Sequence, residues 1–227
     1  NDKTITFDTF TSTGNVILTT QGTAGHVTID NTAVALGVEG TVAGDLALTS
    51  GEAITDSNTL TVSGTTTVTT DVNDKAITLG TLVSTGSIIV TTQGTAGHVT
   101  IDNTTTALGV QGTVAGDLVL TSGEAITDSA VLTVSGTTTA TTDVADKSIT
   151  LDGLVSTGNV ILSTTGTSGH ATIDNTAVAL GVQGTIGGDL ALTSGEAITD
   201  SNTLTVGGTT TVTTDVNDKT IIFDTFA

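Results

Sequence analysis

The feature that most constrains this chain is an internal repeat with a constant period. The segment SGEAITDS occurs unchanged at 50–57, 122–129 and 194–201, which sets a 72-residue period, and single residues elsewhere keep the same spacing. A fixed period predicts a repeat architecture, in which each unit packs against its neighbours rather than around one central core. We therefore expect a single solenoid array over residues 1–227. Its expected units are repeats 1–72, 73–144 and 145–216, followed by a partial fourth repeat at 217–227.

The side chains predict an all-β chain. The apolar residues are almost entirely Ala, Val, Ile and Leu, and β-branched Thr and Val are abundant. Such side chains suit a pleated, half-buried surface. Around His26–Asp30, Val27 and Ile29 alternate with polar residues, which is the two-residue period of a strand with one buried face. Because no ten-residue segment shows helical periodicity, we predict no helix.

The internal plan of the repeat predicts a parallel β-solenoid with about three coils per repeat. Segments 45–64, 65–86 and 87–116 each contain three short apolar runs, which suggests three coils of triangular cross-section. Inward positions would form columns, with Ile54 over Ile77 over Val99. At the strand spacing of about 4.8 Å, one repeat would advance roughly 14 Å. The residues expected to hold these columns, together with their copies in the later repeats, are Leu46, Leu48, Ile54, Leu60 and Val62.

A single coil of such an array is not stable alone, because each coil needs hydrogen-bonded neighbours. We therefore expect either end-to-end self-association or continuation in a longer repeat chain, and the lack of Met and of a basic, apolar leader favours a processed or longer protein. Phe7 and Phe10 near one end match Phe223 and Phe226 near the other, whereas internal copies carry Leu. This pattern predicts either a higher-order period of three repeats or larger side chains that seal or join the ends.

Charge and composition exclude several classes of partner. The formal net charge is −19, from 23 acidic residues and only four basic ones. Nucleic acids and anionic membranes need basic patches, so neither is an expected partner. The longest apolar runs are far too short for membrane insertion. The chain has no Cys, which excludes disulfides and thiolate metal sites.

Three sets of repeated polar residues are candidate sites. His26, His98 and His170 would line up on one face, but roughly 14 Å apart, too far to share a metal ion. Asp71, Asn73 and Asp74 precede Lys75 in a turn. Clustered oxygen ligands of this kind could hold calcium. No bidentate Glu follows at loop spacing and Lys75 could neutralise the cluster, so a solvated turn is the simpler interpretation.

The third set consists of carboxylate pairs, of which Glu52 with Asp56 is the first. Acid–base catalysis needs two carboxylates in different environments, usually in a cleft. Three identical copies on a repetitive surface offer no unique cleft. We therefore expect no catalytic residue, no cofactor other than the calcium considered above, and no enzyme activity.

Threonine-rich runs such as Thr65–Thr67 raise an ice-binding alternative, since flat threonine arrays on solenoids can order water. An ice-binding face would need an outward Thr-x-Thr on every coil, and only one coil of three shows it clearly. Hydroxyl ladders that support the sheet are the simpler explanation.

Residues 44–70, followed by 73–79 and 97–110, resemble the long repeat regions of filamentous-haemagglutinin-like bacterial exoproteins and giant β-strand-repeat adhesins. In that family, runs of the type GxLxLxxxGxITxSxxLxVxGTTT recur many times. The resemblance implies a right-handed parallel β-helix in a secreted or surface-anchored fibre. We therefore expect a structural segment of an extracellular or cell-surface fibre or adhesin stalk, with a host or surface polysaccharide as a further partner. The alternative is an ice- or carbohydrate-binding solenoid module.

Overall fold

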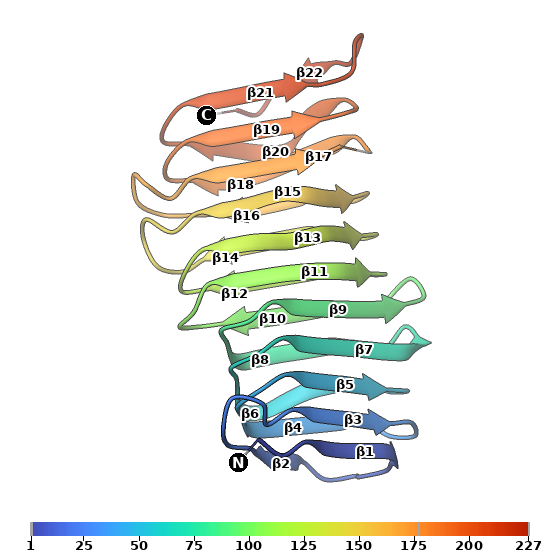
Figure 1. Ribbon diagram of the computed structural model, residues 1–227. Coiled ribbons are helices and arrows are strands. Elements are labelled where there is room, and N and C mark those ends of the chain that lie inside the picture. Colours follow the sequence, from blue (N-terminus) through green and yellow to red (C-terminus); the bar gives the residue numbers. More distant parts are fainter. Residues whose placement is uncertain (1, 177, 227) are drawn as a thin grey trace.

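The predicted β-solenoid is confirmed. The computed structural model describes residues 2–176 and 178–226, so Asn1 and Ala227, the limits of the expected array, lie outside it, as does Ala177. Its strands form two facing sheets of eleven parallel strands, and the chain alternates between them with every strand. In Figure 1 the odd-numbered strands lie in front and point right, and the even-numbered ones return behind. The chain therefore rises as a right-handed coil from the N-terminus at the bottom to the C-terminus at the top.

The strands of the first sheet, here the odd sheet, are β1 (Ile5–Phe10), β3 (Val27–Asn31), β5 (Leu46–Ser50), β7 (Thr66–Asn73), β9 (Ile88–Gln93), β11 (Leu108–Val114), β13 (Ile126–Val134), β15 (Ile149–Ser156), β17 (Ala171–Asn175), β19 (Leu190–Ser194) and β21 (Thr210–Thr214). Those of the second, the even sheet, are β2 (Val16–Thr19), β4 (Leu36–Val42), β6 (Ile54–Val62), β8 (Ile77–Ser84), β10 (Val99–Asn103), β12 (Leu118–Ser122), β14 (Thr138–Thr142), β16 (Val160–Ser163), β18 (Leu180–Ile186), β20 (Ile198–Val206) and β22 (Ile221–Ile222).

Each coil has two strands, so the expectation of a triangular coil with three strands was wrong. The reason is visible in β6, which the sequence divides into two apolar runs separated by polar residues. In the structure these runs belong to one strand. Ile54 pairs with Ile77 and Leu60 with Leu82, and the register shifts between them. The carboxylate of Asp56 fills this bulge by accepting hydrogen bonds from the backbone N–H groups of Gly80 and Thr81, both at 2.7 Å.

Each repeat contains seven strands, which is three and a half coils. Because seven is odd, the copy of a strand in the next repeat lies in the opposite sheet: β1 in the odd sheet corresponds to β8 in the even sheet and β15 in the odd one. At a strand spacing of about 4.8 Å, one repeat advances roughly 17 Å. Successive repeats are thus related by half a turn about the solenoid axis.

The core is one continuous set of aliphatic side chains between the sheets. The expected column is confirmed, since Ile77 pairs with Ile54 on one side and with Val99 on the other, and all three are fully buried. The other residues assigned to the columns, Leu46, Leu48, Leu60 and Val62, are also buried.

Candidate functional site

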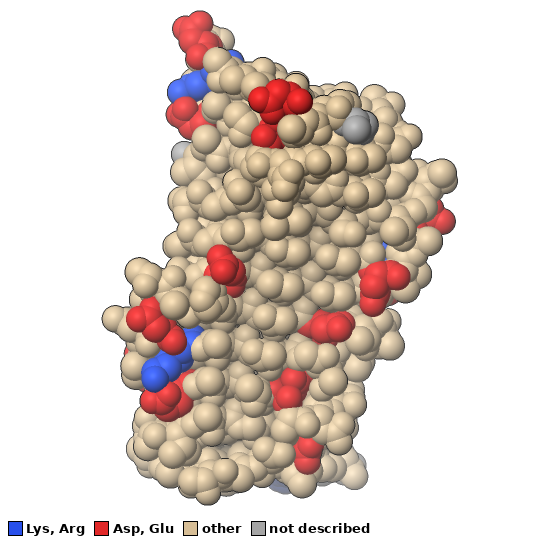
Figure 2. Space-filling view, turned by 180° about the vertical axis from the view of Figure 1, so that it is seen from behind, with Lys and Arg blue, Asp and Glu red and all other residues tan. Residues whose placement is uncertain are grey.

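Repeated ion pairs join neighbouring coils at the edge of the solenoid. The Lys75 ammonium lies 2.7 Å from Glu52, which belongs to the preceding coil. The later copies repeat this contact at 2.6 Å, between Lys147 and Glu124 and between Lys219 and Glu196. In Figure 2 the basic atoms accordingly lie at separate levels, each beside acidic ones. Lys75 therefore pairs with Glu52, and the carboxylates of Asp71 and Asp74 are not its ion-pair partners.

Of the calcium candidates, Asp71 and Asn73 lie at the end of β7, and Asp74 lies in the turn before β8, where it has a structural role. Its Oδ1 accepts hydrogen bonds from the backbone N–H groups of Thr95 and Ala96, at 2.7 and 2.8 Å, so it caps a turn of the next coil. These donors, that of Thr95 above all, lower the pKa of Asp74. Within residues 2–176 and 178–226, no group of three or more His, Cys, Asp or Glu side chains is arranged to hold a metal. Calcium binding by Asp71, Asn73 and Asp74 stays a prediction.

The two carboxylates of the candidate pair, Glu52 and Asp56, have separate structural partners. Glu52 binds Lys75, and Asp56 fills the bulge opposite Gly80 and Thr81. The third copy is the same, with Glu196 on Lys219 and Asp200 accepting the N–H of Thr225 at 2.6 Å. Each carboxylate thus holds the following coil.

The three histidines do not share a face, which corrects the expectation from the sequence. His26 and His170 directly precede β3 and β17 of the odd sheet, whereas His98 precedes β10 of the even sheet. The reason is the odd number of strands per repeat. All three make the same contact: for example, His170 Nδ1 accepts the backbone N–H of Asp189 at 2.8 Å.

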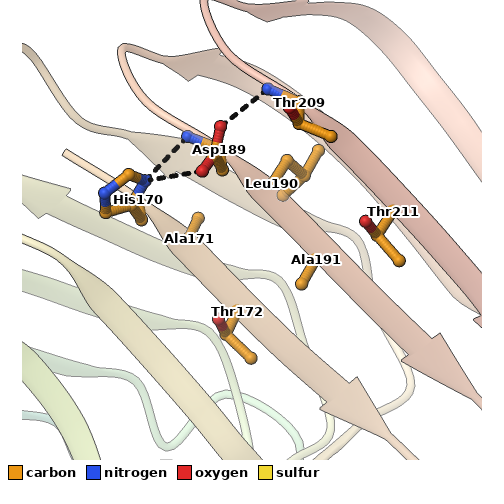
Figure 3. A pocket seen from close by; sticks show the side chains of 8 residues that line it. All are labelled: His170, Ala171, Thr172, Asp189, Leu190, Ala191, Thr209 and Thr211. Carbon is orange, nitrogen blue, oxygen red and sulfur yellow. Dashed lines mark hydrogen bonds and ion pairs between the residues drawn. The ribbon is translucent and has the colours of Figure 1, made fainter. Parts of the chain in front are cut away.

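His170 lines a shallow hollow of about 300 Å³ on the surface (Figure 3). Asp189 connects three coils there, because its backbone N–H donates to His170 and its Oδ1 accepts the N–H of Thr209 at 2.7 Å. Thr172, Ala191 and Thr211 line the rest of the hollow. In the middle repeat the position of Ala191 is taken by the larger Val119.

Outward threonines form longer columns than the sequence revealed. On the odd sheet, successive paired strands place an outward threonine at the same position in five consecutive coils: Thr49, Thr69, Thr91, Thr113 and Thr133. Some strands carry a second outward threonine two residues away, such as Thr67 beside Thr69 on β7. The columns depend on which strands pair, and composition carries no signal for that.

An unpartnered carboxylate oxygen recurs in each repeat and was also missed. The Oδ1 atoms of Asp30, Asp102 and Asp174 are buried and have no hydrogen-bond partner within the described part of the chain. Burial raises the pKa of Asp102, and the charges of Asp143 and Asp56 raise it further. An acidic residue at a half-buried strand position is the only sequence signal for this feature.

Together the two sheets, the single core and the inter-coil contacts define a β-solenoid repeat protein. The chain belongs to a family described as repeats of unknown function (DUF5649), whose model matches residues 24–91, 96–163 and 168–225. The starts of these matches have the same spacing as the repeat found in the sequence. No match was found among the curated proteins or among the solved structures. Among the described residues, none forms a helix long and apolar enough to span a membrane.

Proposed function

We propose that the chain is a structural β-solenoid segment of an extracellular or cell-surface fibre or adhesin stalk, without a catalytic role. The observation that carries this proposal is the continuous core between two eleven-stranded parallel sheets. A stack of eleven coils is roughly 50 Å long, and each added repeat contributes roughly 17 Å. Such a segment sets a distance by its length and holds it by its stiffness.

The polar contacts support this role because they join coils along the axis. Asp56, Asp74 and Glu52 each bind a group that lies one coil further along the chain. Backbone hydrogen bonds between strands run in the same direction, so pulling along the axis loads many of these bonds together. The extracellular location rests on the resemblance to exported repeat proteins, and the net charge of −19 favours solubility.

Electron microscopy of the native material, labelled with antibodies raised against this chain, tests the proposal. We expect label along surface filaments and, in averaged images of them, an axial repeat of roughly 17 Å with a strand spacing of about 4.8 Å. Diffuse labelling inside the cells would contradict the fibre role.

A second candidate function, ice or carbohydrate binding, is favoured by the five-coil threonine column. Thr91 lies in the middle of it, between Thr69 and Thr113. If the column binds ice or a polysaccharide, Thr91→Tyr should abolish thermal hysteresis or retention on a glycan array. Thr121→Tyr, which points outward from β12 on the opposite, even sheet, is the matched control. Absence of both activities in the unmodified chain would eliminate this candidate.

A further inference from the structure

We propose that Asp152 and Gly153 form a self-modification site, at which Asp128 promotes closure of a backbone succinimide that water then opens to isoaspartate. The substrate is the chain's own peptide bond, and water is the only co-reactant. The inference goes beyond the structural role proposed above and does not depend on it, because it concerns a single bulge in the interior of the array.

The third repeat carries a dipeptide that the other repeats lack. Asp152–Gly153 is the only Asp-Gly pair in the sequence, and its copies read Asp8–Thr9, Gly80–Thr81 and Asp224–Thr225. Gly153 is not required by packing, since a Cβ built on it would lie in ordinary contact, 3.4 Å from Oδ2 of Asp128. The lack of a side chain instead leaves the backbone nitrogen of Gly153 unhindered as a nucleophile.

One side chain, rather than the sheet, holds the backbone at this dipeptide. Asp152 and Gly153 lie in the bulge of β15 and pair with neither β13 nor β17 in the strand ladders. Their N–H groups donate to the carboxylate of Asp128, that of Asp152 to Oδ1 at 3.0 Å and that of Gly153 to Oδ2 at 2.7 Å. The nitrogen that would attack is therefore already hydrogen-bonded to a group that can accept its proton.

The two carboxyl groups lie in different environments. Asp128 is half-buried, whereas Asp152 is exposed. Burial raises the pKa of Asp128, and the charge of Asp152 raises it further, against the opposing effect of the two N–H donors. The charge of Asp152 also acts on Asp174 of β17. Carboxyl groups that interact in this way titrate as a pair. In the reactive state the proton lies on Asp152, while Asp128 is ionised and acts as the base.

The reaction balances without a further reagent. The nitrogen of Gly153 forms a bond to Cγ of Asp152 and gives its proton to Asp128. The bond between Cγ and the hydroxyl group of Asp152 breaks, and the hydroxyl leaves as water with the proton that Asp128 accepted. Water then opens the ring: attack at Cγ restores Asp, and attack at the backbone carbonyl carbon gives isoaspartate. Isoaspartate adds a carbon to the main chain between Leu151 and Leu154, which are both completely buried.

Peptide mapping by mass spectrometry tests the proposal on the intact, folded chain kept at mildly acidic pH. In water labelled with heavy oxygen, each round of ring opening leaves a labelled oxygen on residue 152, and electron-transfer fragmentation separates isoaspartate from Asp. Asp224 is the internal control, because Asp200 holds its bulge by the same two N–H contacts but Thr225 follows it. We expect label and isoaspartate at Asp152 and neither at Asp224. Equal labelling of the two positions, or none at Asp152, would overturn the proposal.

Two variants and one change of solvent separate catalysis by Asp128 from the ordinary reactivity of an Asp-Gly pair. Asp128→Asn keeps a carbonyl oxygen for the N–H groups but cannot take up a proton, so labelling should slow by about tenfold or more. Gly153→Thr, which restores the residue of the other repeats, should slow it as strongly, because the branched side chain hinders attack. Circular dichroism establishes that each variant is folded.

The unmodified chain unfolded in urea gives a comparison that does not depend on the folding of a variant. There Asp128 no longer lies beside Gly153, so the folded chain should incorporate label about tenfold faster than the unfolded one. An unchanged rate in folded Asp128→Asn, or an equal or faster rate in urea, would contradict catalysis by Asp128.

Discussion

The interior coils and the end coils place the same sequence motif in different environments. In β8 the residues at the Phe positions are Leu79 and Leu82, and both are completely buried. In the first coil Phe7 is 38% exposed and stacks on Phe10 with ring centroids 4.9 Å apart. At the other end Phe226 is 45% exposed and stacks on Phe223. Burial in this fold thus depends on whether a coil has neighbours on both sides.

A polar group of the second coil, which packs against the first, shows a related difference. Inside the array, the amide oxygen of Asn103 accepts the backbone N–H of Ser84 at 3.0 Å. Asn31 is its equivalent and is also fully buried, yet its amide oxygen has no partner among the described residues. An identical side chain is therefore satisfied in one coil and unsatisfied in another. This comparison teaches that stability is cooperative along the stack, and the following variants test it.

The largest difference is expected between Ile149→Asp and Ile221→Asp, at the same repeat position. Ile149 is completely buried, and a buried unpaired charge should cost more than about 4 kcal/mol in the free energy of unfolding. Ile221 is 45% exposed at the end, where the loss should be below about 1 kcal/mol. Denaturant unfolding followed by circular dichroism measures both. Equal losses would show that burial does not depend on neighbouring coils.

A smaller difference is expected between Leu79→Ala and Phe7→Ala. Removing the buried Leu79 side chain should leave a cavity and cost about 2–5 kcal/mol. Phe7 loses mainly its stacking on Phe10, worth about 0.5–1.5 kcal/mol. A greater loss from Phe7→Ala would mean that the aromatic pair is a cap on which the stack depends.

The third comparison concerns the turn caps Asp74 and Asp218, whose φ angles are nearly equal at +63° and +64°. Asp74→Asn should lower Tm, because it weakens the hydrogen bonds from the backbone N–H groups of Thr95 and Ala96. Asp218→Asn should leave Tm unchanged, because the described chain has no following coil for Asp218 to hold. The pKa of Asp74 is lowered in the folded state, so its stabilisation is present above the ordinary Asp pKa and is lost as pH falls. Calorimetry at neutral and acidic pH checks both statements.

The smallest effect is expected from Asp102→Asn, which should stabilise the fold by on the order of 0.5 kcal/mol at neutral pH. The gain is small because solvent screens the partly exposed carboxylate. Burial, followed by the charges of Asp143 and Asp56, raises the pKa of Asp102, so the folded state favours the protonated form. The charged form therefore costs stability as pH rises through the folded pKa, and Asn removes that cost. The gain should vanish well below the ordinary Asp pKa of about 3.9. A stabilisation independent of pH would exclude this explanation.

The sequence predicted the solenoid because its main signals are local or strictly periodic. The column of Ile54, Ile77 and Val99 follows from alternating apolar residues once parallel coils are assumed, and it was predicted correctly. The number of strands per coil was predicted wrongly. The polar residues between Ile54 and Leu60 are typical of a turn, and nothing local shows that Asp56 meets Gly80 and Thr81 of the next coil.

The polar sites were harder to predict, because their partners lie one coil away. The pairing of Lys75 with Glu52 crosses 23 residues, whereas the Asp cluster beside Lys75 in the sequence suggested a nearer partner. The alternation of His26, His98 and His170 between the two sheets depends on whether a repeat contains an odd or an even number of strands. A single unrecognised bulge changes that number, so no pattern in the sequence decides it.

The distance between spin labels at Thr49 and Thr121 tests the central claim most directly. These residues are one repeat apart and point outward from β5 of the odd sheet and β12 of the even sheet. With half a turn per repeat, their backbones should be about 20 Å apart and the labels further, since the sheets pack about 10 Å apart and the copies are offset by roughly 17 Å. A label distance of about 14 Å, expected for three whole coils per repeat on one face, would contradict the account.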